Sequence, residues 1–243
     1  MFAFLKKKKE DKRPRCAAVV AAAGSSSRMG GHDKLMQDVG GIPVLAHTLQ
    51  ALQAARRVDE IIVATREESL LAVSDLCHTY GITKCSKVVR GGESRTETVL
   101  LAAMEASEQC SRVAVQDGAR PLVTPELIDR VIEVAERTGA AAPALPVKDT
   151  VKTVTEGEQV IQTLQRDTLR AVQTPQVFEK DLLKAALQSA MTMEIAPTDD
   201  CAAVERLGKI VYLIPGEETN LKITTPTDLV LAEALWNAGR SGQ

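Results

Sequence analysis

The chain has 243 residues and a formal net charge of −2, with 44% hydrophobic and 26% charged residues. This composition is typical of a folded globular protein, and the length is sufficient to bury a core without disulfides or a structural metal. Because the charge is nearly balanced, it gives no reason to expect binding to nucleic acid or to an anionic membrane. Aromatic residues make up only 2% of the chain, too few for a platform that stacks nucleic-acid bases.

The cysteines and histidines limit the chemistry further. Five cysteines are widely spaced, without a C-x-x-C pair. This pattern predicts free thiols in a reducing, cytoplasmic compartment rather than a disulfide framework or a zinc site. The three histidines leave little for a metal cluster or for a Ser–His or Cys–His hydrolase. No apolar run reaches the ~18–20 residues that a membrane span requires.

Residues 1–14 differ in composition from the rest of the chain. Five mostly apolar residues precede a basic run from Lys6 to Arg13. A secretory signal peptide has the reverse order, with basic residues first and an apolar stretch of ~7–15 residues after them. We interpret the segment as a solvated basic tail, with weak contact to a membrane surface as the alternative. The remainder, residues 15–238, is predicted to form a single domain.

Short apolar runs alternate with helical patterns through the first 147 residues. In chain order, the sequence predicts a strand at 17–23, a helix at 44–52, a strand at 61–65, a helix at 67–80, a strand at 87–90, a helix at 94–106, a strand at 112–116, a helix at 125–138 and a strand at 140–147. Continuous apolar runs are typical of parallel strands that are buried on both faces. The alternation therefore predicts an α/β fold, with a mostly parallel sheet covered by helices on both faces.

The segment after residue 147 breaks this alternation. Two β-rich runs, 149–154 and 159–164, flank Thr155-Glu156-Gly157-Glu158, a pattern typical of a β-hairpin. We expect this hairpin to project from the sheet as an arm at about residues 148–168. After it, the sequence predicts a helix at 180–190, strands at 209–214 and 221–224, and a closing helix at 227–236.

Three predicted helices carry explicit end signals. Ser94 and Glu97 have the spacing of a capping box. Pro125 stands at the first position of its helix, and Gly139 follows the end of that helix. The segment Thr225-Pro226-Thr227-Asp228 has the same character, with Thr225 as the cap. We therefore assign this last segment to helix capping alone.

The loop after the first predicted strand is the first candidate site, because ligands of open parallel sheets bind beyond the carboxyl ends of the strands. It reads AGSSSRMGGHDK from Ala23 to Lys34. Small residues allow close approach of the backbone and its N–H groups to an anion, and Arg28 and Lys34 add two cations. The loop matches neither the Walker A pattern nor the dinucleotide fingerprint. It predicts a polyphosphate site, with a flexible surface loop as the alternative.

Three further segments are candidates. The turn from Arg90 to Thr98 is rich in small and polar groups, although plain turn and capping chemistry explains it equally well. Asp117 ends a buried strand, where a carboxylate could hold Mg²⁺ or a hydroxyl group; the alternative is an Asp–Gly turn paired with Arg120. Lys222 is a lone lysine near a predicted strand, for which a surface position is the alternative.

Taken together, these segments resemble the nucleotidyltransferases of the Rossmann-like, glycosyltransferase-A-like fold. The resemblance is strongest to the 2-C-methyl-D-erythritol 4-phosphate cytidylyltransferase family, and it extends from about Arg15 to Trp236. Seven segments follow the order and spacing of that family: AAAGSSSRMGGHDK, RGGESRTETV, QDGARP, PVKDTVK, QTPQVF, TDDCAAVE and NLKIT. Seven collinear segments are a specific signal, whereas the first alone would indicate only some nucleotidyltransferase.

The resemblance implies three groups of site residues. The catalytic cations, which would stabilise charge at the reacting phosphorus, are Arg28, Lys34, Arg166 and Lys222. The residues that would bind CTP are Ala22, Ala23, Gly24, Gly92, Glu93 and Thr98. The residues that would bind the acceptor, a polyol phosphate, are Asp117, Arg120, Thr150, Thr174 and Thr198. Asp117 is also the candidate ligand for Mg²⁺, the divalent cation that the reaction would use.

The resemblance further implies a homodimer, because the arm of this family crosses to the partner subunit and would carry Thr150 and Arg166 with it. Family members commonly have Gly where Ser26 stands, and Gln often stands at the position of Leu35. Two alternatives remain open. One is a cytidylyltransferase for another polyol phosphate, such as ribitol 5-phosphate, and the other is a non-catalytic nucleotide-binding protein.

Overall fold

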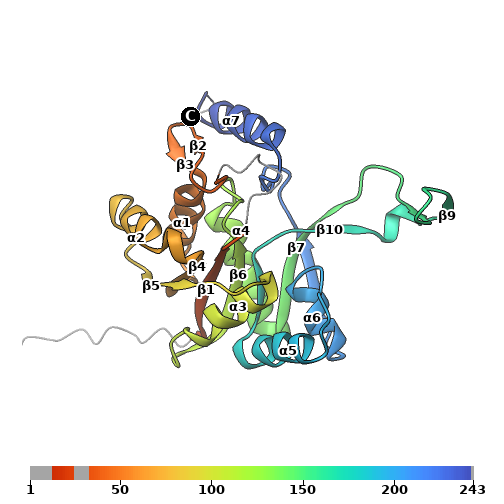
Figure 1. The fold of residues 1–243 in the computed structure, drawn as a ribbon, viewed down its shortest axis with the longest axis horizontal. Coiled ribbons are helices and arrows are strands. Elements are labelled where there is room, and N and C mark those ends of the chain that lie inside the picture. The colour runs from red at the N-terminus through yellow and green to blue at the C-terminus, as the bar shows by residue number, and fades with distance from the viewer. Residues whose placement is uncertain (1–12, 25–32, 242–243) are drawn as a thin grey trace, which may run out of the picture.

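The computed structural model describes residues 13–24 and 33–241, which are arranged around one large sheet (Figure 1). Its strands are β1 (Arg15–Ala22), β4 (Glu60–Thr65), β5 (Cys85–Arg90), β6 (Cys110–Asp117), β7 (Ala140–Pro146), β10 (Arg170–Val172), β11 (Gln176–Glu179) and β12 (Tyr212–Pro215). The order across the sheet is β10-β7-β11-β6-β1-β4-β5, and β12 pairs with β7. The central strand β1 is parallel to both of its neighbours, β4 and β6.

Helices lie on both sides of this sheet (Figure 1). They are α1 (Val44–Ala54), α2 (Leu70–Thr79), α3 (Arg95–Met104), α4 (Pro125–Thr138), α5 (Lys180–Thr192), α6 (Asp200–Arg206) and α7 (Pro226–Ser241). Side chains of α1, α2 and α4 share one buried cluster with Ala18 and Val20 of β1, whereas those of α3, α5 and α6 share a second cluster with Ala17 and Val19. The predicted α/β fold with helices on both faces is therefore confirmed.

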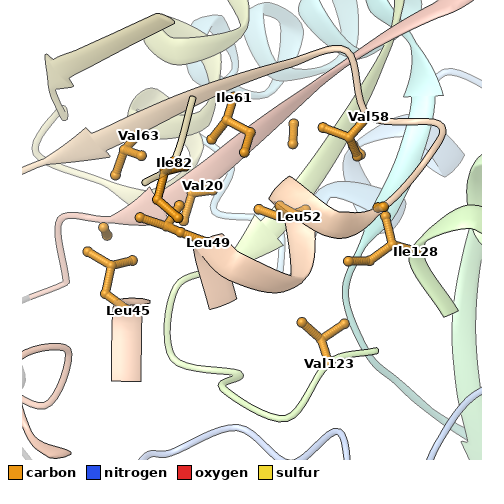
Figure 2. Close-up of a cluster of buried hydrophobic side chains, with 14 of the residues drawn as sticks. Val20, Leu45, Leu49, Leu52, Val58, Ile61, Val63, Ile82, Val123 and Ile128 are labelled. Carbon is orange, nitrogen blue, oxygen red and sulfur yellow. The ribbon is translucent and has the colours of Figure 1, made fainter. Parts of the chain in front are cut away.

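Helix α1 shows how the sequence builds this core. Leu45, Leu49 and Leu52 recur at helical spacing and are fully buried. In Figure 2 they face Val20 of β1 and Ile61 of β4. A stripe of this kind is the apolar face of an amphipathic helix, and its burial supplies the stability of the layer. The parallel half of the sheet is thus packed against α1 through buried aliphatic side chains.

The sheet is mixed rather than wholly parallel. β11 lies between β6 and β7 and is antiparallel to both, and β10 is also antiparallel to β7. The sequence analysis predicted neither of these strands, nor the short helix α6. Each has only three to seven residues, so none offers a run long enough for its periodicity to be recognised.

One predicted strand is absent and another is displaced. Residues 221–224 form no strand, because their backbone donors have other partners. The N–H of Ile223 donates to the carbonyl of Ala119, and the N–H of Thr224 donates to Asp228 at the start of α7. The strand predicted at 209–214 lies instead at Tyr212–Pro215. The first of these corrections matters for the site, since Lys222 stands in the irregular segment.

The predicted helix caps are confirmed. The Ser94 hydroxyl accepts a hydrogen bond from the N–H of Glu97 at 3.1 Å, and Gly139 ends α4 in the left-handed region at φ 86°. Asp228 accepts from the N–H groups of Thr224 and Thr225 at 2.8 Å each. The oxygens of Ser94 and Asp228 accept from N–H groups at the start of their helices, and the N–H of Gly139 donates to the carbonyl of Ala135 at the end of α4.

The predicted hairpin is also present. β8 (Lys152–Val154) and β9 (Val160–Thr163) pair only with each other, and Figure 1 shows this arm extending away from the sheet. Val154, Val160 and Ile161 are exposed on it. At the other end of the molecule, a second small hairpin of β2 (Asp38–Val39) and β3 (Ile42–Pro43) packs near α7. Among the described residues, no helix combines the length and apolar character needed to cross a membrane.

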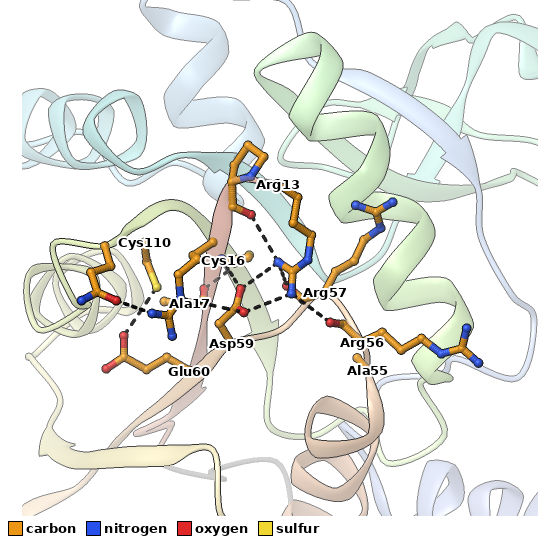
Figure 3. A network of polar contacts seen from close by, with 12 residues as sticks. Arg13, Cys16, Ala17, Ala55, Arg56, Arg57, Asp59, Glu60 and Cys110 are labelled. Atoms are coloured by element: carbon orange, nitrogen blue, oxygen red, sulfur yellow. Dashed lines mark hydrogen bonds and ion pairs between the residues drawn. The ribbon is translucent and has the colours of Figure 1, made fainter. Parts of the chain in front are cut away.

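The start of β1 is fixed by an arginine–carboxylate pair (Figure 3). Arg13 donates to both carboxylate oxygens of Asp59, at 2.8 and 3.0 Å, and Asp59 also accepts from the N–H of Cys16 at 2.9 Å. Burial alone would raise the pKa of Asp59, but these hydrogen bonds and the charge of Arg13 outweigh it, so the pKa lies below its usual value. Arg13, within the predicted tail, is thus anchored, whereas residues 1–12 lie outside the described chain.

We predict that Asp59→Asn lowers the free energy of unfolding at pH 7 by about 1–3 kcal/mol, the scale of hydrogen bonds to a charged group. Because the pKa of Asp59 is lower in the folded state, its contribution is fully present above the unfolded pKa of about 3.9 and is lost as the pH falls below it. Urea unfolding at pH 7 and near pH 3 measures both effects. Asp75→Asn, on the exposed face of α2, is the control, and an equal effect of both substitutions would contradict the prediction.

Candidate active site

Two adjoining cavities open beyond the carboxyl ends of β1 and β6. The first, which we call the Gly92 cavity, has a volume of about 350 Å³ and is lined by Ala21, Ala22, Ala23, Gly24, Lys34, Leu35, Gly92, Glu93, Ser94, Arg95, Thr98, Asp117, Gly118, Ala119 and Lys222. The second, the Thr174 cavity, has a volume of about 290 Å³ and is lined by Arg95, Asp117, Arg120, Val172, Thr174, Gln176, Thr198, Asp199 and Lys222. Arg95, Asp117 and Lys222 line both.

The structure brings most of the predicted site residues together. Every described residue predicted to bind the nucleotide lines the Gly92 cavity, together with Lys34. Four of the five residues predicted to bind the acceptor line the Thr174 cavity. Thr150 and Arg166 line neither cavity of their own chain, because both lie on the exposed arm. Arg28 lies outside the described residues.

The wall of the Gly92 cavity depends on close contact between two loops. A Cβ at Gly91 would come within 2.6 Å of the Ala23 Cβ and 3.0 Å of the Thr98 hydroxyl, so only glycine allows this approach. The Thr98 hydroxyl accepts from the N–H of Gly92 at 3.1 Å, and Glu97 accepts from the N–H of Glu93 at 2.7 Å. Thr98 is buried and holds the backbone of this loop in place.

The segment that carries Lys34 is fixed on both sides. Asp33 accepts from the N–H of Leu35 at 3.1 Å and forms an ion pair with Arg66 at 2.8 Å. Leu35 is 4% exposed and belongs to the core cluster of α1. An apolar residue at this position therefore anchors the end of the loop in the core. Lys34 is partly buried and stands in the wall of the Gly92 cavity.

Asp117, the last residue of β6, is surrounded by three cations. Its carboxylate lies 2.9 Å from the ammonium of Lys222 and 3.5 Å from the guanidinium groups of Arg95 and Arg120. Burial alone would raise the pKa of Asp117, but the three positive charges outweigh this effect and hold the pKa below its usual value. Asp117 therefore remains ionised and fixes the position of the Lys222 ammonium at the boundary between the cavities.

Buried hydrogen bonds tie the three loops around Asp117 together. Arg120, 8% exposed, donates to the carbonyl of Asn220 at 2.6 Å. The buried Asn220 amide donates to the carbonyl of Thr174 at 3.0 Å, and the Thr174 hydroxyl accepts from the N–H of Asp117 at 3.1 Å. Arg120 and Thr174 thus hold the backbone that presents Lys222, in addition to lining the cavity.

The donor set fits a protein-held metal ion poorly. Asp117 is already engaged by three cations, and its neighbour Asp200 is paired with Arg95. Within the described part of the chain, no three His, Cys, Asp or Glu side chains are grouped so as to hold a metal ion. Asp117 therefore fits the role of an anchor for cationic side chains, and a divalent ion would depend on oxygen ligands from a bound anion.

The sequence analysis missed several residues that shape the site, among them Arg95, Gln176 and Asn220. Arg95 stands within the segment RGGESRTETV and directly after the predicted cap Ser94. Its position offered a signal, because a cation in the first turn of a helix lies at the unfavourable end of the helix dipole and needs a local anionic partner. Gln176 and Asn220 act through buried backbone hydrogen bonds that no sequence pattern shows.

Comparison with known proteins decides the family. A profile of the 2-C-methyl-D-erythritol 4-phosphate cytidylyltransferase family matches residues 16–238. The chain belongs to this family. A protein of that name from Halalkalibacterium halodurans is 42% identical over 205 residues, which cover 84% of this chain and 89% of that protein.

Solved structures of the cytidylyltransferase family agree with this assignment. The 4-diphosphocytidyl-2C-methyl-D-erythritol synthase of Anaerococcus prevotii is similar with a TM-score of 0.82 at 29% identity, covering 92% of this chain and 96% of that one. The 2-C-methyl-D-erythritol 4-phosphate cytidylyltransferase of Thermus thermophilus gives a TM-score of 0.73 at 36% identity, with coverages of 91% and 98%. The cytidylyltransferase fold thus extends over nearly the whole chain.

We predict that Arg120→Met lowers the free energy of unfolding by about 1–3 kcal/mol, because it removes a buried charged donor from the Asn220 carbonyl and one of the three cations that pair with the buried Asp117 carboxylate. Lys222→Met should cost less than about 1 kcal/mol, since the Lys222 side chain is 38% exposed and exposed pairs contribute little. Chemical denaturation of the two variants makes the comparison. Equal destabilisation would contradict the structural role assigned to Arg120.

Proposed function

We propose that the protein transfers the cytidylyl group of CTP to 2-C-methyl-D-erythritol 4-phosphate, forming 4-diphosphocytidyl-2-C-methyl-D-erythritol and pyrophosphate in the non-mevalonate route to isoprenoids. The observation that carries the proposal is the family match over residues 16–238, together with two adjoining cavities that meet at one cationic cluster. A transfer between two phosphorylated substrates needs two such subsites side by side.

The Gly92 cavity is the proposed CTP subsite. The backbone of residues 22–24 and the loop at Gly92 and Glu93 would hold the nucleotide, with Thr98 keeping that loop in position. Lys34 would stabilise the negative charge that develops on the triphosphate during transfer. A preorganised cation of this kind acts most strongly when it is fixed before the reaction, as the anchored segment at Asp33 and Leu35 provides.

The Thr174 cavity is the proposed acceptor subsite. Lys222, held by Asp117, would bind the incoming phosphate at the boundary with the CTP subsite. A phosphate oxygen of the acceptor attacks the α-phosphorus of CTP, and the bond between this phosphorus and the pyrophosphate oxygen breaks. No protein nucleophile is required, because positioning and neutralisation of charge supply most of the catalysis. The scarcity of histidine is therefore no obstacle.

A divalent cation, Mg²⁺, belongs to the same proposal as a partner of the triphosphate. When bound, it would neutralise charge on the phosphate oxygens. Because three cations already pair with Asp117, the ion would be held through the oxygens of the nucleotide rather than by this carboxylate. The cytoplasmic location is likewise proposed from the cysteines, all five of which are free thiols.

The test is pyrophosphate release from CTP with a panel of polyol phosphates. We predict turnover with 2-C-methyl-D-erythritol 4-phosphate in the presence of Mg²⁺, and loss of turnover when the metal is removed with a chelator. Faster turnover with ribitol 5-phosphate would overturn the acceptor assignment. Binding of CTP without turnover of any acceptor would favour a non-catalytic nucleotide-binding protein.

We also propose that the arm completes the active site of a second subunit. Its apolar residues Val154, Val160 and Ile161 are 43%, 56% and 67% exposed, and an isolated two-stranded hairpin is only marginally stable in water. Packing against a second copy of the chain would cover these side chains. Arg166 follows the hairpin and is exposed, with its guanidinium donating to the carbonyl of Lys148 at 3.0 Å, so it would enter the acceptor subsite of the neighbour.

Mixed dimers test this arrangement. We predict that Arg166→Ala and Lys34→Ala homodimers are both nearly inactive, and that refolding the two together restores activity to about a quarter of wild type. Recovery is expected because a mixed dimer places both defects in one composite site and leaves the other site intact. If Arg166 acts within its own chain, each site carries one defect, and no recovery follows even when mass analysis confirms mixed dimers.

A further inference from the structure

The guanidinium of Arg95 stands where the Gly92 cavity and the Thr174 cavity meet. Arg95 is the first residue of α3, and it forms ion pairs with Asp200 at 2.8 Å and with Asp117 at 3.5 Å. These two carboxylates come from different elements, since Asp117 ends β6 and Asp200 begins α6. Arg95 therefore bridges α3, β6 and α6 at the site.

The buried carboxylate of Asp200 depends on Arg95 for its counter-charge. Its side chain is 1% exposed, and Arg95 is the cation with which it forms an ion pair within the described chain. Burial raises the pKa of Asp200, an effect that the charge of Arg95 only partly offsets. A buried carboxylate without a counter-charge is costly. The two side chains are consequently restrained with respect to each other, more strongly than an exposed pair would be.

The Arg95–Asp200 pair fixes one end of the turn that lines the Thr174 cavity. Thr198 and Asp199 precede Asp200 directly and both line that cavity. From the other side, the carbonyl oxygen of the Gln176 side chain accepts from the N–H of Asp200 at 3.0 Å, and its amide donates to Asp199 at 2.8 Å. The turn is thus held by Gln176 on β11 and by Arg95 on α3.

The loop of the Gly92 cavity does not depend on Arg95 in the same way. Its backbone N–H groups at Gly92 and Glu93 donate to Thr98 and Glu97. Both acceptors lie on α3 itself, so they hold the loop through local hydrogen bonds. Removal of the Arg95 side chain would leave these bonds in place, while it takes away the counter-charge of Asp200 and one of the three cations that pair with Asp117.

We propose that Arg95 is a positioning residue for the acceptor, which sets the orientation of Asp117 and of the turn at residues 198–200 through its bridge between two carboxylates. This inference rests on the proposed function and deepens it. Both contacts are made by one terminal nitrogen of the guanidinium, Nη2. The lysine ammonium stands one bond closer to the backbone than this nitrogen, and it is more strongly hydrated and so harder to place beside a buried carboxylate. Lysine at this position should therefore fail to replace arginine.

The experiment measures initial rates with each substrate varied in turn, and it measures CTP affinity by calorimetry. The variants are Arg95→Met, Arg95→Lys, Asp200→Asn and the double variant Arg95→Met with Asp200→Asn. The matched control is Arg90→Met, because Arg90 stands before the same loop but is 71% exposed and pairs with the exposed Glu67. Turnover by the wild-type enzyme tests the proposed function separately, so its failure is distinguishable from failure of this inference.

We expect both Arg95 variants to raise the KM for the acceptor at least about tenfold, the scale for a misplaced reacting group. CTP affinity should fall by a smaller factor than the acceptor KM rises, because Arg95 lines the CTP subsite but the loop there is held by its own hydrogen bonds. The double variant should be no worse than Arg95→Met, because coupled residues are not additive. Asp200→Asn should shift the acceptor KM in the same direction, and it supplies the test if an Arg95 variant fails to fold. Normal kinetics of Arg95→Lys, an equal loss of CTP affinity, or additive effects of the two sites would overturn the proposal.

Discussion

The ionised carboxylate of Asp117 is the group on which the arrangement of the site depends. It ends the buried strand β6 and pairs with Lys222, Arg95 and Arg120, which come from three different segments. A carboxylate in this position holds three cations close together that would otherwise repel one another. The site thus presents positive charge at a fixed place before any phosphate arrives, and catalysis by charge stabilisation requires this preorganisation.

The cations of this cluster differ in burial, and this difference distinguishes a structural role from a chemical one. Arg120 is buried and donates a hydrogen bond to the carbonyl of Asn220. Its charge therefore mainly stabilises the loops around Asp117. The Lys222 side chain is 38% exposed and lines both cavities, so its charge is available to a ligand. Residues of one charge and one neighbourhood therefore differ in function, and a charge count alone would not distinguish them.

The parallel half of the fold and most residues of the Gly92 cavity could be predicted from the sequence. Apolar runs and caps placed β1, β4 and β6 correctly, because buried parallel strands read as continuous apolar segments. The loop at Gly92 was found through its small residues, and Asp117 through its position at a strand end. The antiparallel half was not found: β10, β11 and α6 are too short to show a period. Lys222 was placed on a strand that does not form, since the backbone N–H groups of its segment donate to the Ala119 carbonyl and the Asp228 carboxylate.

The difference between these two halves explains where the second subsite lies. β1 is flanked by β4 and β6 on its two sides, which is the switch point where open α/β sheets bind a ligand, and the Gly92 cavity opens there. Beyond β6 the neighbour is the antiparallel β11, so the chain enters that strand, rather than leaving it, at the edge where Asp117 stands. Thr174 and Gln176 consequently face the end of β6, and the turn before α6 packs on Gln176. A wholly parallel sheet would place the start of that strand at the opposite edge, so the reversal of strand direction is what sets a second cavity beside the first.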